Sequence, residues 1–269
     1  MKQGKVWLVG AGPGDGGLLT CKGYHVLTEQ AQVVVYDSLV GQEILALIPP
    51  HVETIDVGKR AGSHPVPQGQ INQILLEQAQ AGKNVVRLKG GDPFLFGRGG
   101  EELELLIQND IPFEIVPGVT SAVAVPAYAG IPVTHRDYAS SVHIITGHKK
   151  QGGILDVDFP SLAKLHGTLV FLMGLSNVGA ICDGLMQAGM DGATPAAVLQ
   201  QGTTARQRRV VSTLDKLAAK VQAAGILPPA IIVVGQVCVL AETERITDSA
   251  PPVQVTLFVC FSTNGVKVP

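Results

Sequence analysis

Short apolar runs recur along the first half of the chain, each followed by a more polar segment. They stand at residues 6–9, 32–36, 52–57, 84–88 and 113–116. The segments at 18–32, 68–81 and 100–108 between them read as helices. Continuous apolar strands that alternate with helices are typical of a mostly parallel sheet buried on both faces. The pattern therefore predicts an α/β unit.

A second series of apolar runs begins after residue 137. Its predicted strands are 142–146, 168–173, 196–200 and 230–234, and its predicted helices are 177–188 and 212–224. We therefore expect two α/β lobes, an N-terminal one over residues 1–137 and a C-terminal one over 138–246. Residues 247–269 form a tail to which the pattern assigns no role.

One stretch imitates a membrane span. Residues 115–134 carry no charge over about twenty positions, the length that crosses a bilayer. However, Pro117, Pro126 and Pro132 together with Gly118 and Gly130 divide it into short pieces, and small residues dominate it. The expected structure is a strand end, a tight turn and a buried helix of small residues, with no membrane association.

Composition narrows the possible functions. The chain has 269 residues, of which 46% are hydrophobic and 16% charged, so it can bury a sizeable core. A formal net charge of -2 argues against nucleic acid as a partner. The four cysteines form no C-x-x-C pair and the seven histidines show no metal-binding spacing, so we expect reduced thiols, a cytoplasmic location and no metal site.

The sequence GPGDGG at residues 12–17 follows the first predicted strand, and Asp37 follows the next one. This spacing is that of a dinucleotide-binding loop with a ribose-binding acid. Against that interpretation, Pro13 removes a backbone donor, and Asp15 places a carboxylate at the helix N-terminus where a phosphate would bind. The loop favours a ligand without a phosphate, with Asp15 capping the following helix. A plain strand-to-helix turn is the alternative.

A second glycine cluster, RLKGGDPFLFGRGGEE, occupies residues 87–102. Gly90 and Gly91 at the end of a strand would allow a ligand to approach the backbone closely. Asp92 could accept hydrogen bonds from a ribose or an amine. This combination indicates a binding site more specifically than either glycine loop alone.

Taken together, the segments resemble the tetrapyrrole methylases, a family of enzymes that use S-adenosylmethionine. The matching segments, in order, are VGAGPGDGGLLT, VVVYDSLV, GKRAGSH, RLKGGDPFLFGRGGEE, PGVTSAVAVPAYAGIPVTHRDYASS, ITGH, TLVFLMG, QQGTTARQ and PAIIVVGQV, which cover roughly residues 6–238. Gly16 departs from the proline that many relatives carry after GPGD, and the last twenty or so residues match no segment of the family.

The resemblance implies a bilobal α/β enzyme that holds S-adenosylmethionine in the cleft between its lobes and releases S-adenosylhomocysteine. It also implies a homodimer. The cofactor contacts that it implies are Pro13, Gly90, Gly91, Asp92, Leu95, Thr120, Ser121, Met173, Gly202 and Ala230.

The activity that the resemblance implies is C-methylation of uroporphyrinogen III at C2 and C7, which gives precorrin-2 by way of precorrin-1, for sirohaem or cobalamin. Asp37 would act as the catalytic carboxylate and Lys59 as its partner, although a solvated acid at a strand end is an equally simple interpretation of Asp37. Because the substrate carries many carboxylates, we expect Arg98, Lys59 and Arg136 to bind it. Further basic candidates near the glycine motifs are Arg60, Arg87, Lys89 and His135. Some of the basic residues would instead be ordinary exposed charges or partners of Glu101, Glu102 and Asp137.

Three other functions stay open at this point. A methylase acting on a later corrin ring would share the cofactor loops. An NAD-dependent oxidoreductase would use residues 12–17 and Asp37 instead. A tetrapyrrole carrier would bind the macrocycle without consuming a cofactor.

Overall fold

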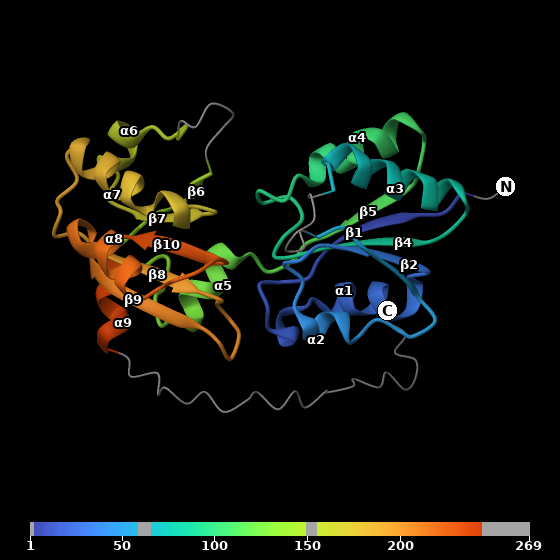
Figure 1. Cartoon of the computed structure of the whole chain (residues 1–269), viewed down its shortest axis with the longest axis horizontal. Coiled ribbons are helices and arrows are strands. Elements are labelled where there is room, and N and C mark those ends of the chain that lie inside the picture. The colour runs from blue at the N-terminus through green and yellow to red at the C-terminus, as the bar shows by residue number, and fades with distance from the viewer. Residues whose placement is uncertain (1–2, 59–65, 149–154, 244–269) are drawn as a thin grey trace, which may run out of the picture.

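The computed structural model describes residues 3–58, 66–148 and 155–243, which form two α/β lobes side by side (Figure 1). Each lobe contains one five-stranded sheet. This confirms the predicted bilobal α/β fold.

The sheet of the first lobe is entirely parallel and has the strand order β3-β2-β4-β1-β5. Its strands are β1 (Val6–Gly10), β2 (Val33–Tyr36), β3 (Glu53–Asp56), β4 (Val85–Lys89) and β5 (Phe113–Val116). The central strands β1 and β2 are apolar or nearly so because helices cover both faces of the sheet, whereas β4 also carries Arg87 and Lys89. All carboxyl ends point to the same edge, where ligands of such sheets bind.

Helices cover both faces of this sheet (Figure 1). The helices are α1 (Cys21–His25), α2 (Gln42–Leu45), α3 (Gln68–Gln80) and α4 (Gly99–Gln108). Val26 and Ile44, from the α1 and α2 side, pack in one core, and Leu75 and Leu106, from α3 and α4, pack in the other. The single helix predicted at 18–32 is instead a 3-10 turn η1 (Gly16–Leu18), α1 and a π-helical turn η2 (Val26–Gln30).

The sheet of the second lobe is mixed, with the order β6-β7-β10-β8-β9. Its strands are β6 (Val142–Thr146), β7 (Thr168–Leu172), β8 (Pro195–Gln200), β9 (Arg208–Thr213) and β10 (Ala230–Val234). Only β6 and β7 pair in parallel, and β10 is antiparallel to both of its neighbours. The sequence pattern missed β9, because this edge strand begins with two exposed arginines and reads as polar.

The helices of the second lobe are α5 (Ser121–Tyr128), α6 (Phe159–Ala163), α7 (Val178–Gln187), α8 (Leu214–Ala223) and α9 (Leu240–Thr243), with the 3-10 turns η3 (Leu175–Asn177) and η4 (Gln236–Val239). The stretch 115–134 divides into the end of β5, a turn and the small-residue helix α5, as predicted. Within the described ranges, no helix is long and apolar enough to cross a bilayer.

The chain enters the second core early. Ala122 and Val125 of α5 pack with residues of β7, β8 and β10. The boundary between residues 137 and 138 stays a prediction, and the tail at 247–269 lies outside the described residues.

Candidate active site

Three loops meet at the carboxyl end of the first sheet. Gly12 and Gly91, which follow β1 and β4, have φ angles of +74° and +70° and exchange backbone hydrogen bonds of 3.2 and 2.7 Å. Gly118 follows β5, and a Cβ atom placed on it would lie 2.2 Å from the Gly91 carbonyl oxygen and 2.6 Å from the Cα atom of Gly10. Glycine alone allows three backbones to come this close. The loops that were predicted to bind a ligand therefore lie together.

Asp92 ties two of these loops to each other. Its Oδ1 accepts hydrogen bonds from the amides of Phe94 and Leu95, at 2.9 and 3.1 Å, and its Oδ2 accepts one from the amide of Gly118 at 3.0 Å. Each amide is a backbone donor that would otherwise need another partner. Asp92 thus shapes the loop after β4, and its contact with a cofactor stays a prediction.

Three predicted cofactor residues of the second lobe share one edge of its sheet. Ala230 opens β10 and pairs with Gln200, the last residue of β8. Gly202 follows two positions later. Met173 directly follows β7, which runs antiparallel to β10, and therefore lies at the same edge. Its φ angle is +57° and its side chain is 51% exposed.

The lobes touch where the loop after β1 meets the second sheet. The Asp15 amide donates to Oγ1 of Thr203 at 3.2 Å, and the Tyr128 hydroxyl donates to Oδ2 of Asp15 at 2.7 Å. Partial burial and the neighbouring carboxylate raise the pKa of Tyr128 to about 12. Oδ1 of Asp15 caps η1 by accepting from the Gly17 amide at 2.7 Å, which confirms the predicted cap.

The remaining predicted cofactor residues lie on or beside the same loops. Pro13 is half-buried after β1. Leu95 reaches from the first lobe to pack against the core of the second. Oγ1 of Thr120 caps α5 by accepting from the Ala122 amide at 3.2 Å, and Ser121 begins that helix. The predicted cofactor residues therefore lie at the carboxyl end of the first sheet and at the edge of the second sheet that faces it, although more than two hundred positions of sequence separate the first of them from the last.

Asp37 lies just beyond β2, at the same carboxyl edge as the glycine loops. Its Oδ1 accepts from the Leu39 amide at 3.0 Å, and its Oδ2 lies 3.5 Å from Nη2 of Arg87. The side chain is 25% exposed, so a reactant could reach it. Its catalytic role stays a prediction. Lys59, its predicted partner, lies outside the described residues.

The predicted substrate-binding arginines differ in their surroundings. The Arg98 guanidinium forms a two-pronged ion pair with Glu101, with distances of 2.9 and 2.5 Å, and this pairing raises the pKa of Arg98. Arg136 is exposed in the loop before β6. Both side chains lie at the surface, and their contact with a substrate stays a prediction.

For two of the further basic candidates, the structure confirms the alternative of an ion pair with a neighbouring acid. Arg87 and Lys89 lie on the same face of β4, buried beneath α4, where both pair with the carboxylate of Glu102. Glu102 is one of the three acids that the sequence offered as alternative partners of the basic candidates. The spacing of the two cations is a further signal, because residues i and i+2 of a strand share one face.

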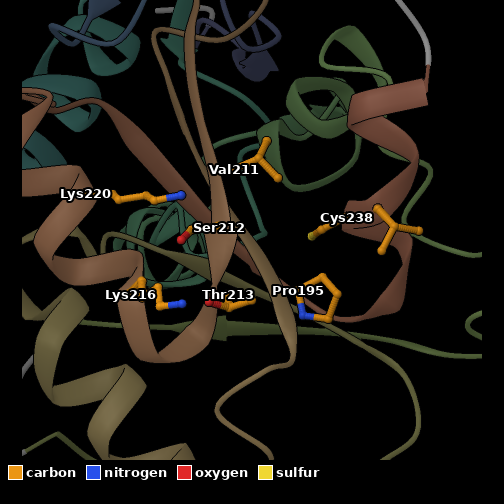
Figure 2. Close-up of a pocket in the computed structure, with 8 residues that line it drawn as sticks. Pro195, Val211, Ser212, Thr213, Lys216, Lys220 and Cys238 are labelled. Carbon is orange, nitrogen blue, oxygen red and sulfur yellow. The ribbon is translucent and has the colours of Figure 1, made fainter.

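A separate hollow of about 330 Å³ lies on the second lobe (Figure 2). It is lined by Pro195, Val211, Ser212, Thr213, Lys216, Lys220, Cys238 and Val239. Because Pro195 begins β8 whereas Gln200 ends it, the hollow lies at the opposite edge of the sheet from Met173 and Ala230. No group of acidic, histidine or cysteine side chains in the described part of the chain is arranged to hold a metal ion.

A sequence profile of the tetrapyrrole (corrin/porphyrin) methylases matches residues 5–218. The chain is 57% identical over 242 residues to the porphyrin biosynthesis protein HemD of Ruminiclostridium josui, covering 90% of this chain and 48% of that protein. It is 55% identical over 240 residues to siroheme synthase 1 of Aeromonas hydrophila, covering 89% and 51%. The chain thus spans about half the length of these curated relatives.

Solved structures share the fold over nearly their full length. Uroporphyrin-III C-methyl transferase from Thermus thermophilus, complexed with S-adenyl homocysteine, superposes with a TM-score of 0.74 at 42% identity, covering 87% of this chain and 93% of that one. Cobalt precorrin-4 methyltransferase, a cobalamin biosynthetic enzyme, gives a TM-score of 0.77 at 31% identity, covering 87% and 95%. Because sequence profile and fold agree over most of its length, the chain belongs to the tetrapyrrole (corrin/porphyrin) methylase family.

Proposed function

We propose that this chain transfers methyl groups from S-adenosylmethionine to C2 and C7 of uroporphyrinogen III, giving precorrin-2 by way of precorrin-1. The observation that carries the proposal is the likeness to the Thermus thermophilus enzyme, which covers 93% of that chain and whose structure contains S-adenyl homocysteine. Names that the longer relatives carry, porphyrin biosynthesis and siroheme synthesis, agree with the same substrate.

The glycine loops fit the cofactor. A Cβ atom on Gly91 would have no heavy atom within 4 Å, so the space beside this residue is open to a ligand. Leu39 packs against one side of Gly90, because a Cβ atom placed on Gly90 would lie 2.6 Å from the Cβ atom of Leu39. A ligand can therefore approach the backbone of Gly90 only from the other side. The open side of Gly91, the exposed Met173 and the edge at Ala230 support binding of a compact, uncharged adenosine group through backbone and small side chains.

The chemistry assigns separate tasks to the residues of the first lobe. S-adenosylmethionine supplies an electrophilic methyl group on its sulfonium. A pyrrole carbon would attack the methyl carbon in line while the bond from this carbon to sulfur breaks and S-adenosylhomocysteine leaves, so the chain mainly has to orient the two reactants. The ring must then lose a proton, and Asp37 is the carboxylate that we assign to accept it. Arg98, Lys59 and Arg136 would bind the substrate carboxylates.

Binding experiments distinguish this function from the dinucleotide alternative. Calorimetric titration should show binding of S-adenosylmethionine and S-adenosylhomocysteine and none of NADH. Binding of NADH alone would return residues 12–17 and Asp37 to the dinucleotide interpretation. If S-adenosylmethionine binds, Asp37→Asn should lower kcat with little change in cofactor affinity.

A later corrin ring is the second candidate substrate, because cobalt precorrin-4 methyltransferase has the same fold. The higher sequence identity to the uroporphyrin-III enzyme, 42% against 31%, favours the earlier substrate. We also infer a homodimer from the family resemblance, and a cytoplasmic location from four cysteines that form no C-x-x-C pair. Leu227, in the apolar segment 226–240, is exposed and would be buried if this segment formed the dimer interface. Sedimentation velocity tests whether the chain forms a dimer.

A further inference from the structure

A buried carboxylate occupies the underside of α4. Glu102 is 0% exposed, and its Oε1 accepts three hydrogen bonds: from Nε2 of Gln68 at 3.2 Å, Nε of Arg87 at 3.0 Å and Nζ of Lys89 at 2.8 Å. Its Oε2 has no hydrogen-bond partner among the described residues. Such a group is costly to bury, because each unsatisfied oxygen loses its hydration.

Arg87 connects this carboxylate to the edge of the sheet. Its Nε faces Glu102, its Nη2 lies 3.5 Å from Oδ2 of Asp37, and its Nη1 donates to the carbonyl oxygens of Val35 and Leu88 at 3.4 and 3.1 Å. A guanidinium is planar and rigid, so fixing one side of it fixes the direction of the other. The position of Glu102 therefore determines where Nη2 of Arg87 lies relative to Asp37.

The four charged side chains of this cluster balance one another, and one of them is partly exposed. Arg87 and Lys89 carry two positive charges, and Glu102 and Asp37 carry two negative ones. Burial and the neighbouring Arg87 lower the pKa of Lys89. Of these groups only Asp37 reaches the surface to a substantial degree, at 25% exposure. Apolar side chains of similar volume would stabilise such a core as well or better, so stability does not explain the set.

We infer that Glu102 is a positioning residue, which acts through Arg87 to hold the Asp37 carboxylate in place for the methyl-transfer reaction. This inference rests on the proposed function, in which Asp37 accepts the proton. Oδ1 of Asp37 is already anchored by the Leu39 amide, so the Arg87 contact on Oδ2 fixes the remaining rotation of the carboxylate. Lys89 completes the charge balance around Glu102.

A double-mutant cycle tests the inference. The variants are Glu102→Gln, Asp37→Asn and the combination, with kcat for methyl transfer measured at saturating substrates and expressed per cofactor site titrated with S-adenosylhomocysteine. We expect Glu102→Gln to lower kcat about tenfold, as for a misplaced catalytic group, and to leave the cofactor Kd within about twofold of wild type. In the Asp37→Asn background it should lower kcat by less than about twofold, because its effect passes through Asp37. The control Glu104→Gln, an exposed carboxylate on the same helix, should leave kcat unchanged.

The outcomes separate this inference from the proposed function. If Glu102→Gln lowers kcat equally with and without Asp37, it acts on the fold or on another step and the positioning role is overturned. If Asp37→Asn keeps the wild-type kcat, the assignment of Asp37 as the base fails, and the positioning role fails with it. Should Glu102→Gln not fold, Arg87→Lys takes its place in the same cycle, because it keeps the cation but loses the second arm of the guanidinium.

Discussion

Replacing Gly118 by alanine should destabilise the first lobe, because three backbones meet at this residue. The new Cβ atom would lie 2.2 Å from the Gly91 carbonyl oxygen and 2.6 Å from the Cα atom of Gly10, so the loops would have to separate by about 1 Å. That movement would also strain the 3.0 Å hydrogen bond from the Gly118 amide to Asp92. Overpacking and the weakened hydrogen bond together predict a loss of about 2–4 kcal/mol in the free energy of unfolding.

A matched substitution in the same lobe should have the opposite sign. Gly69 lies in the first turn of α3, and a Cβ atom there would meet nothing within 4 Å, so Gly69→Ala should stabilise by up to about 1 kcal/mol. Urea unfolding followed by the fluorescence of Trp7 measures both changes, since this single tryptophan is 6% exposed in β1. A Gly118→Ala variant within about 0.5 kcal/mol of wild type would refute the close packing of the loops.

Three further predictions concern the ion pair on β5, the contact between the lobes and the first core. Hydrogen bonds from two lysines lower the pKa of Glu114 to about 2, so Glu114→Gln should cost about 1 kcal/mol at neutral pH, and urea titrations should show this difference vanish as pH falls from 4.5 towards 2. The raised pKa of Tyr128 predicts that wild type loses stability between pH 10 and about 12, and thermal unfolding of Tyr128→Phe should show a smaller loss. Leu106→Ala, at a side chain with no exposure, should cost about 2–5 kcal/mol in the same urea assay; a loss below about 1 kcal/mol would contradict its place in the core.

The central strands β1 and β2 could be predicted because helices bury both of their faces. The run VVVY at 33–36 is apolar until its last residue and consists mainly of β-branched valine, and both features favour a buried strand. The edge strand β9 escaped prediction because Arg208 and Arg209 face solvent and its last residues lead directly into α8. The pattern therefore merged part of the strand with the helix.

The glycine loops were predictable, but the burial of the charges beside them was not. Gly90, Gly91 and Asp92 could be recognised because two glycines at the end of a strand allow a ligand to approach the backbone closely. Arg87 and Lys89 look like surface cations until α4 is placed over them, and that placement depends on contacts between segments distant in sequence. The same holds for Tyr128 and Asp15, which are 113 positions apart and meet only because the lobes face each other.

The most direct measurement is an anaerobic incubation of the purified protein with uroporphyrinogen III and S-adenosylmethionine labelled in its methyl group, followed by mass spectrometry of the tetrapyrrole. The proposed function predicts a product that carries two labelled methyl groups, with a singly labelled species at early times. S-adenosylmethionine that binds while uroporphyrinogen III stays unlabelled would contradict the proposed substrate.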